Sequence, residues 1–398
     1  MSGDPSPLDG IRVLELGSFI AGPFAGQLLG DLGADVIKVE PPGTGDPMRR
    51  WGVLENDKSL WWPAIARNKR SVVVDLRSDG GRDLARQLAT HVDVVLENFK
   101  PGTLERWGLG YDALAAANPG VVLVHVSGFG QTGPRAHEPG FGAIGEAVGG
   151  VRHTTGDADR PPARAGISLG DSLAALFAVI GTLAALQERH RSGRGQEVDV
   201  AIAEAVFALM ESTVADYELG GVVRGRSGGV LKGVAPSNAY PTSDGAAVVI
   251  AANADAVFAR LVVAMERPDL GERYATHSAR AEHQTELDDE IAAWTGALAA
   301  DALLAVLEEH SIPAGRIHTA PDVATDPHLA AREMVLRMAA GYSQDVPMAG
   351  VVPKLSRTPG AVRTVGPALG ANTDEILREL AALSDAEIDA LRAAGVVG

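Results

Sequence analysis

Residues 11–40 read IRVLELGSFIAGPFAGQLLGDLGADVIKVE, and this stretch decides the fold of the chain. The apolar run Ile11–Leu16 predicts a short strand, and the glycine-rich segment after it predicts a turn followed by a helix. Val36–Val39 predicts a second strand that ends at Glu40. A strand, a crossover helix and a second strand in this order form a β-α-β unit, which is the building block of a doubly wound parallel sheet.

The first turn of this unit leaves a nucleotide-binding alternative open. Glu40 falls near the place where an acid would bind a ribose in a dinucleotide site, which is typical of an NAD(P)- or flavin-dependent oxidoreductase. The glycines, however, fall at Gly17, Gly22 and Gly26, which is not the G-x-G-x-x-G spacing. We therefore favour a tight turn with close helix packing and keep the oxidoreductase as an alternative.

Strands and helices continue to alternate as far as residue 127. Further strands are predicted at 71–76, 93–97 and 121–127, and helices at 79–89 and 111–117. This pattern predicts an α/β fold with a parallel sheet covered by helices on both faces. Ligands bind outside the carboxyl ends of such strands. Asn98–Phe99 and Gly128–Gly133 each follow a strand, so we expect both segments to border the ligand crevice.

A second decisive stretch is RAGISLGDSLAALFAVIGTLAALQERH, residues 164–190. Its apolar residues recur every three or four positions, which predicts a long helix with a continuous apolar face. Asp171 stands where the N-cap of that helix is expected, next to Gly170. A carboxylate there can satisfy free backbone amides. It can also act as a nucleophile on a thioester, and the local pattern leaves both roles open.

Composition and charge exclude several classes of function. The net charge of −16 argues against nucleic acid as a partner, because phosphate backbones require a basic face. The chain contains no cysteine, and its histidines lack metal-ligand spacing, so we expect no metal site. The polar N-terminus does not resemble a signal peptide. The longest apolar stretch is interrupted by Gly181 and Thr182, which predicts no membrane span and a cytoplasmic protein.

Composition also predicts the domain boundaries. Residues 220–245 are rich in Gly, Ser and Pro and are interpreted as a linker with a mobile flap. A strand at 246–252 and helices near 254–266, 283–297 and 300–309 follow. We predict a large domain at 1–222, a small α/β domain with its linkers at 223–325, and a return to the large domain at 326–398, where Ser384 caps the last helix.

Several segments together resemble the class III coenzyme A transferases, the family of formyl-CoA transferase and carnitine CoA-transferase. The matching segments span residues 8–396 and include LDGIRVLELGSFIAGPFAGQLLGDLGADVIKVEPPGTGD, NKRSVVVDL, DVVLENFKPGTLERWGLGYDAL, NPGVVLVHVSGFGQTGPRA and ISLGDSLAALFAVIGTLAAL. The resemblance implies a Rossmann-like large domain, a smaller domain and two chains interlocked as a homodimer. It also implies acyl-CoA and carboxylic acid substrates, with coenzyme A as co-substrate and no permanently bound cofactor.

The resemblance carries functional roles onto particular residues. Asp171 falls on the catalytic aspartate of the family, which forms a mixed anhydride and then an aspartyl-CoA thioester. The implied coenzyme A contacts are Ser18, Phe19, Ile20, Asn68, Lys69, Arg70, Asn98, Phe99 and Arg106.

A sister branch of the family, the α-methylacyl-CoA racemases, carries a His beside an Asp in the segment before this helix. Here those positions are Phe141 and Gly142, which cannot transfer a proton, so transfer is favoured and a racemase remains the alternative. Gly142 also departs from the glutamate of formyl-CoA transferase. Glu146 lies one helical turn later, and we expect a structural role for it rather than a substitute carboxylate.

The sequence also suggests a substrate class and a lid. Arg135, Arg152 and Arg164 could pair with a second carboxylate, which favours a dicarboxylyl donor such as succinyl-CoA. The mixed anhydride must be protected from water. Ser227–Gly228–Gly229 is the candidate lid, with a plain flexible linker as the alternative.

Overall fold

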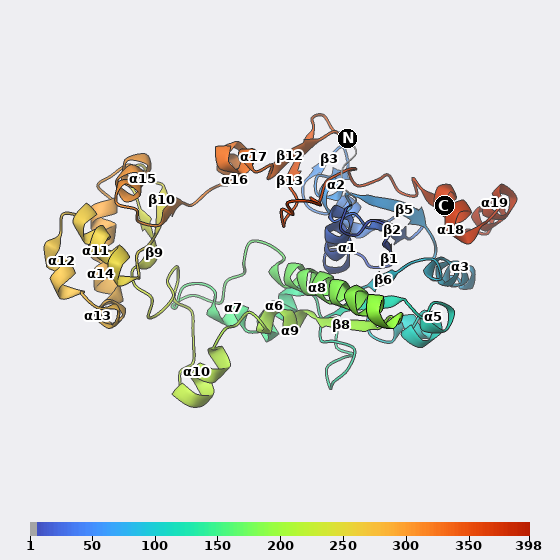
Figure 1. The fold of residues 1–398 in the computed structure, drawn as a ribbon, viewed down its shortest axis with the longest axis horizontal. Coiled ribbons are helices and arrows are strands. Elements are labelled where there is room, and N and C mark those ends of the chain that lie inside the picture. Colours follow the sequence, from blue (N-terminus) through green and yellow to red (C-terminus); the bar gives the residue numbers. More distant parts are fainter. Residues whose placement is uncertain (1–5) are drawn as a thin grey trace. The chain divides into compact units, whose positions relative to one another are not determined.

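The computed structural model describes residues 6–398, which fall into two compact units (Figure 1). The larger unit combines the chain up to residue 151 with 165–212 and 328–398, and the smaller unit combines 152–164 with 213–327. The predicted boundary at 222/223 followed the change in composition. The contacts change ten residues earlier, because α10 (Thr213–Gly220) belongs to the smaller unit, as does the segment 152–164.

A six-stranded parallel sheet forms the centre of the larger unit, which confirms the α/β fold class. Its strands lie in the order β5-β2-β1-β6-β7-β8. Counted along the chain this order is 3-2-1-4-5-6, the doubly wound arrangement, and it reverses between β1 and β6. The bounds are β1 Arg12–Glu15, β2 Asp35–Glu40, β5 Lys69–Val73, β6 Val94–Glu97, β7 Val122–Ser127 and β8 Glu197–Ala201.

Helices cover both faces of this sheet, because neighbouring strand residues point to opposite sides. Leu14 faces a core that includes α3 (Asp79–Ala89), α5 (Tyr111–Ala117), α18 (Thr373–Ala381) and α19 (Asp385–Ala393). Val13 faces the opposite core, built with α1 (Ala21–Asp31), α8 (Leu169–Ser192) and α9 (Ile202–Phe207). Ser384 caps α19 in a capping box with Glu387, as predicted.

Shorter elements complete the larger unit. They are the 3-10 helix η1 Pro47–Arg50, the hairpin β3 Leu54–Glu55 with β4 Lys58–Ser59, α2 Trp62–Ile65, α4 Thr103–Arg106, α6 Gly142–Val148, and the antiparallel pair β12 Val335–Met338 with β13 Val346–Ala349. Two helices cross the boundary between the units: α7 Val151–Thr154 and α17 Pro327–Ala331.

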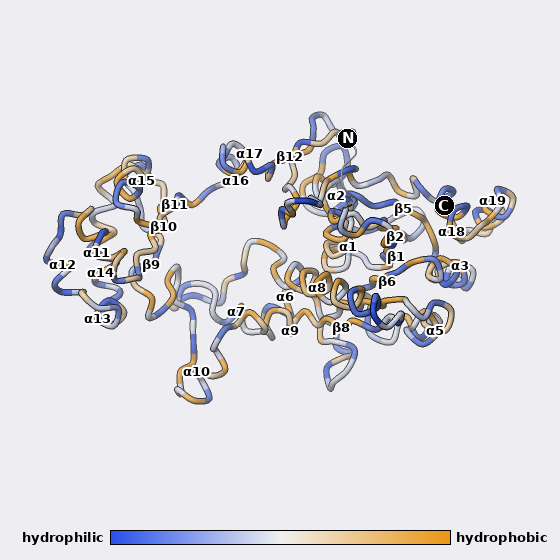
Figure 2. The backbone as a smooth tube through the Cα atoms, in the orientation of Figure 1, coloured by the Kyte–Doolittle hydropathy of each residue, from blue (hydrophilic) through white to orange (hydrophobic). Residues whose placement is uncertain are grey.

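The central helix α8 is longer than the sequence interpretation allowed. It runs unbroken through Gly181 and Thr182 for 24 residues, so it is long and apolar enough to cross a membrane by length and composition. The helices α14 (Gln284–Thr295) and α15 (Ala300–Glu309) pass the same test when they are counted together, although the pair is bent by 113° at its break. Much of α8 is apolar in colour in Figure 2, and its small residues pack on the sheet, as a core helix would. The buried residues of this face are Ala174, Ala175, Ala178, Val179, Thr182, Ala185 and Leu186.

The smaller unit packs helices on a three-stranded antiparallel sheet in the order β11-β10-β9. Its core gathers apolar side chains such as Tyr240, Ile250 and Leu303. Its elements are α10, β9 Ser237–Pro241, β10 Ala247–Ala251, α11 Asp255–Ala264, α12 Pro268–Arg273, α13 His277–Glu282, α14 Gln284–Thr295, α15 Ala300–Glu309, β11 Ala314–Arg316 and α16 Ala320–Thr325. The strand β9 lies inside the stretch interpreted as a linker.

Candidate active site

The turn that follows β1 is held by the side chain of Asn98. The Ser18 amide donates to Asn98 Oδ1 at 2.8 Å, and Asn98 Nδ2 donates back to the Ser18 carbonyl at 2.8 Å. Gly17 permits this approach, since a Cβ there would lie 2.6 Å from Asn98 Oδ1. Gly26 likewise leaves space for the Glu15 carboxylate. The glycines of the first turn therefore serve close packing, as the spacing predicted.

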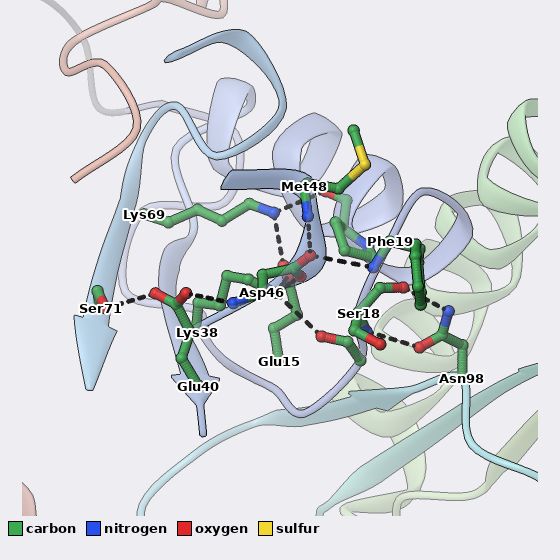
Figure 3. Close-up of polar contacts among 12 residues, drawn as sticks. Glu15, Ser18, Phe19, Lys38, Glu40, Asp46, Met48, Lys69, Ser71 and Asn98 are labelled. Atoms are coloured by element: carbon green, nitrogen blue, oxygen red, sulfur yellow. Dashed lines mark hydrogen bonds and ion pairs between the residues drawn. The ribbon is translucent and has the colours of Figure 1, made fainter. Parts of the chain in front are cut away.

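A cluster of buried charges lies beneath this turn (Figure 3). Lys38 Nζ lies 2.9 Å from Glu15 Oε1 and 2.8 Å from Asp46 Oδ2, and it donates to the Gly17 carbonyl at 2.9 Å. Lys69 Nζ lies 2.8 Å from Glu15 Oε2. All four side chains are essentially inaccessible to water. Buried charges persist only when they are paired and hydrogen-bonded, so the turn rests on a fixed ionic support.

The backbone of the turn is itself unusual. Phe19 has a φ of 64°, in the left-handed region that non-glycine residues seldom adopt. Its amide donates to Asp46 Oδ1 at 3.3 Å, and its ring packs edge-on against Trp51. Such a conformation costs about 1–3 kcal/mol and persists only where its surroundings impose it. Asp46 and Asn98 together impose it here.

The charges in this cluster shift one another's ionisation. Burial alone would raise the pKa of Glu15, but the ammonium groups of Lys38 and Lys69 outweigh it and hold that pKa below its ordinary value. Burial opposes the charge of Lys38 too, yet the carboxylates of Glu15 and Asp46 raise the pKa of Lys38 above its ordinary value. For Lys69, burial dominates and lowers the pKa.

Glu40, the candidate ribose-binding acid, belongs to the same buried region. Its carboxylate accepts from Arg49 through both oxygens at 2.7 Å, from the Ser71 hydroxyl at 2.6 Å and from the Asp46 amide at 2.9 Å. Both oxygens are therefore engaged within the protein. These contacts make Glu40 a structural acid and remove the feature that had suggested a dinucleotide.

A pocket of about 300 Å³ opens at the carboxyl ends of the central strands. Ser18 from the first turn, Phe99 and Trp107 contribute to its wall, and the two aromatic rings pack edge to face with centroids 5.1 Å apart. This is the edge where ligands bind in open α/β sheets. The other lining residues are Leu16, Gly17, Val39, Glu40, Pro41, Thr44, Gly45, Asp46, Pro47, Val74, Asp75, Leu76 and Arg77.

The cationic residues at this edge of the sheet include one that was not predicted from the sequence. Arg77 follows β5, is exposed and lines the pocket, but sequence reasoning missed it. Applying the rule that ligands lie beyond the carboxyl ends of strands to β5 would have selected residues 75–77. Arg106 is exposed in α4, where it donates to the Thr103 hydroxyl at 2.9 Å.

Residues 68–70, which were predicted to contact coenzyme A, bind other residues of the chain in the structure. These residues stand at the start of β5, away from its carboxyl end, and none lines the pocket. Asn68 donates to Asp31 and to the Ala361 carbonyl, and Lys69 belongs to the buried cluster. Arg70 pairs with three carboxylates, those of Asp35, Glu375 and Glu379. Their contacts are those of structural residues.

The remaining predicted residues of the first turn divide between pocket and core. Ser18 lines the pocket, whereas Phe19 and Ile20 do not. Ile20 is buried in a small apolar cluster with Met48 and Trp62. Asn98 is occupied by the Ser18 peptide, so its contacts are those of a residue that positions the turn.

A buried ion pair lies directly behind Phe99. Glu97 Oε1 lies 2.5 Å from His125 Nδ1, and Glu97 Oε2 accepts from the Phe99 amide at 2.6 Å. Burial raises the pKa of Glu97 in spite of its imidazole partner. Burial would lower the pKa of His125, but Glu97 and the nearby Glu197 outweigh it and raise that pKa. The pair orients the chain as it leaves β6.

Asp171 lies in the first turn of α8, although not at the position that the sequence predicted. The helix begins at Leu169 with Ser168 as N-cap, so Asp171 is the third helical residue. The prediction of an N-cap was wrong because the backbone of Gly170 is already helical. Asp171 is partly exposed and does not line the pocket described above. A carboxylate in the first turn of a helix is stabilised in its charged form by the helix dipole.

The surroundings of Asp171 are built from small residues. A Cβ added to Gly142 would lie 2.7 Å from Asp171 Cγ, and a Cβ on Gly170 would lie 2.7 Å from the Gly142 carbonyl oxygen. Glu146 is buried, and its Oε1 accepts from the Gly170 amide at 3.4 Å. Phe141 is largely exposed. Positions 141 and 142 thus offer no group for proton transfer, as expected.

Three further sequence predictions concern arginines and the flap. Arg135 pairs with Glu138 and lies over the Phe129 ring, so its charge is engaged locally. Arg152 and Arg164 belong to the smaller unit. In the flap, the Gly228 amide donates to the Gly156 carbonyl at 2.9 Å. Among residues 6–398, no group of three His, Asp or Glu side chains is arranged to hold a metal ion.

The fold and this site define the class of protein: a doubly wound α/β enzyme with a ligand crevice at the carboxyl edge and an aspartate at a helix N-terminus. The model of CoA-transferase family III matches residues 8–373, and the chain belongs to this family. It is therefore a family III CoA-transferase.

Named relatives and a solved structure agree with this assignment. The chain is 55% identical over 396 residues to a succinyl-CoA–D-citramalate CoA-transferase of Chloroflexus aurantiacus, covering 99% of this chain and 98% of the relative. It is 40% identical to the alpha subunit of a succinyl-CoA–L-malate CoA-transferase of Chloroflexus aurantiacus, with 98% and 92% covered. A CaiB/BaiF family protein of Brucella suis superposes with a TM-score of 0.84 at 35% identity, covering 95% of this chain and all of the other.

Proposed function

We propose that this enzyme transfers coenzyme A from succinyl-CoA to a small dicarboxylic acid that carries a hydroxyl group, of the citramalate or malate kind. The names of the two relatives at 55% and 40% identity support this donor and this class of acceptor. The observation that carries the mechanism is the partly exposed carboxylate of Asp171 in the first turn of a 24-residue helix.

Asp171 is the nucleophile in this proposal. Its carboxylate attacks the thioester carbonyl of succinyl-CoA, the carbon–sulfur bond breaks, and coenzyme A leaves as the thiolate with a succinyl-aspartyl anhydride remaining. The thiolate then attacks the aspartyl carbonyl, which releases succinate and leaves an aspartyl-CoA thioester. The acceptor carboxylate repeats the two steps in reverse order and leaves as the new acyl-CoA. Asp171 is regenerated, and no water is consumed.

Coenzyme A occupies the pocket at the carboxyl edge of the sheet. Phe99 and Trp107 provide flat apolar surface for an adenine ring or a pantetheine chain, and Arg77 provides the charge for a phosphate. Arg106 is a second exposed cation on the helix that follows Phe99. The turn at Ser18 forms the boundary nearest β1. The Gly228–Gly229 segment stays our candidate lid.

The substitution Asp171→Ala tests the covalent scheme. Wild-type enzyme incubated with succinyl-CoA should gain the mass of a coenzyme A adduct on the peptide that contains residue 171, whereas the variant should form no adduct and no citramalyl- or malyl-CoA. Binding of free coenzyme A should be unchanged in the variant. Substantial transfer by D171A would eliminate the nucleophile, and a panel of carboxylic acids with wild-type enzyme tests the acceptor independently.

We further propose that the enzyme is a homodimer of interlocked chains. Leu176, Ile180 and Leu183 are exposed at helical spacing on α8, and Phe207 and Leu209 are exposed at and just beyond the end of α9. Large apolar side chains exposed together on one helix are typical of an interface. Light scattering after gel filtration should give twice the mass of the 41.2 kDa chain. A monomer at micromolar concentration would contradict the proposal.

A further inference from the structure

Gly142 is the first residue of α6, and the Asp171 carboxylate occupies the space that any side chain at Gly142 would need. A Cβ built on Gly142 would lie 2.7 Å from Asp171 Cγ and 3.1 Å from Oδ1, and closer still to Oδ2. Real Cβ atoms essentially never approach another heavy atom within 3.0 Å. Asp171 and a side chain at position 142 therefore exclude each other in this geometry.

The backbone itself does not require glycine at this position. Gly142 is absent from the glycines of the described chain whose φ is positive, and it starts a regular helix with Phe141 as N-cap. Alanine is compatible with that conformation, so its cost would come from the missing space alone. By contrast, a Cβ on Gly166, five residues before Asp171, would meet nothing within 4 Å.

Moving α6 away from α8 to make room would open a closely packed contact. A Cβ on Gly170 would lie 2.7 Å from the Gly142 carbonyl oxygen, so the starts of α6 and α8 are already in backbone contact. Further along α6, a Cβ on Gly145 would lie 3.1 Å from Ile202 Cβ, and one on Gly149 would lie 2.8 Å from the Ala203 carbonyl oxygen. The glycine face of α6 is thus packed against α8 and α9 along its length. The Asp171 side chain, which can rotate, would be the part that moves.

We propose that Gly142 is a positioning residue for the transfer reaction: the space left by its missing side chain admits the rotamer in which Asp171 presents its carboxylate, and any side chain at this position would displace it. This inference rests on the proposed role of Asp171 as the nucleophile. It assigns a function to the position where the sequence departs from formyl-CoA transferase.

The test is Gly142→Ala, with Gly166→Ala as the matched control. Ordinary contact requires about 3.5 Å between carbon atoms, so a Cβ at 142 displaces Asp171 Cγ by about 1 Å. A misplacement of about 1 Å in a reacting group lowers the rate about 100-fold. We expect G142A to lose about 100-fold in kcat and in the rate of adduct formation. KM for succinyl-CoA and the melting temperature should stay those of wild type, and G166A should match wild type throughout.

A loss smaller than about tenfold in kcat, or an equal loss in G166A, would overturn the positioning role. If D171A itself retains transfer, the proposed function fails, whereas an inactive D171A beside a fully active G142A refutes only the role of Gly142. Should G142A fail to fold, the double variant G142A/D171A decides. If the double variant folds, the Asp171 side chain is what cannot coexist with a side chain at position 142. If G142A and the double variant both fail to fold, the proposal is overturned.

Discussion

Replacing Lys38 by methionine should destabilise the larger unit strongly, because this one ammonium group neutralises two carboxylates that water cannot reach. Methionine has a similar volume and no charge. In the variant, Glu15 would keep Lys69 at 2.8 Å, whereas Asp46 Oδ2 would face a methyl group. Removing one partner of a buried ion pair costs about 3–5 kcal/mol, since a charge then stays buried without compensation.

The loss can be measured by chemical unfolding followed through tryptophan fluorescence, which reports mainly on the larger unit because it holds four of the five tryptophans. The double variant Lys38→Met/Asp46→Asn should lose less than the sum of the two single variants. A loss below about 1 kcal/mol at neutral pH, or fully additive losses in the double variant, would refute the reasoning.

The pocket and the turn lead to three further expectations. Arg77→Ala should raise KM for succinyl-CoA at least tenfold with kcat unchanged, because a charge-assisted bond to phosphate contributes about 1.5–3 kcal/mol; Arg70→Ala should lower stability without changing KM, and the opposite result would return the coenzyme A contact to Arg70. Asn98→Ala removes both hydrogen bonds to Ser18, so the free energy of unfolding should fall by about 2 kcal/mol and KM for succinyl-CoA should rise. Unchanged stability in denaturant would show that these bonds do not stabilise the turn. The pKa of Glu15 lies below its ordinary value of 4.5, so its stabilisation is present above pH 4.5 and is lost as the pH falls further. In a plot of melting temperature against pH, Glu15→Gln should reduce the fall in melting temperature below pH 4.5. An unchanged fall would show that other groups cause the loss of stability in acid.

The parts of the fold that depend on local pattern could be predicted closely. Alternation of strand and helix gave the parallel sheet, and the helix Tyr111–Ala117 was predicted with its observed bounds. The strand β9 was missed because it lies within a segment rich in glycine and proline, where pairing with β10 overrides local preference. The helix α8 begins three residues before the predicted start, because the backbone of Gly170 is helical and does not mark the boundary.

In the candidate site, some residues could be predicted from the sequence and others could not. Residues 68–70 look like an anion site in sequence because three polar groups adjoin one another. Their partners, such as Asp31, are distant in sequence and could not be inferred from it. Arg77, in contrast, is isolated in sequence and is brought to the crevice by its place beyond β5. The empty space at Gly142 has no signature in a single chain, because a glycine required for space looks the same as one required for a turn.

The larger unit is assembled from three separate lengths of chain, and this division constrains when it can form during synthesis. Ile376, Leu377, Leu380 and Ile388 fill the core beneath β5, and Val397 pairs with Val74 through a backbone bridge. The ribosome will therefore have made the whole smaller unit, and nearly all of the polypeptide, before the C-terminal helices can cover this face of the central sheet. Until then the nascent chain carries an uncovered apolar sheet face, which makes it a substrate for chaperones and places the greatest risk of aggregation late in translation.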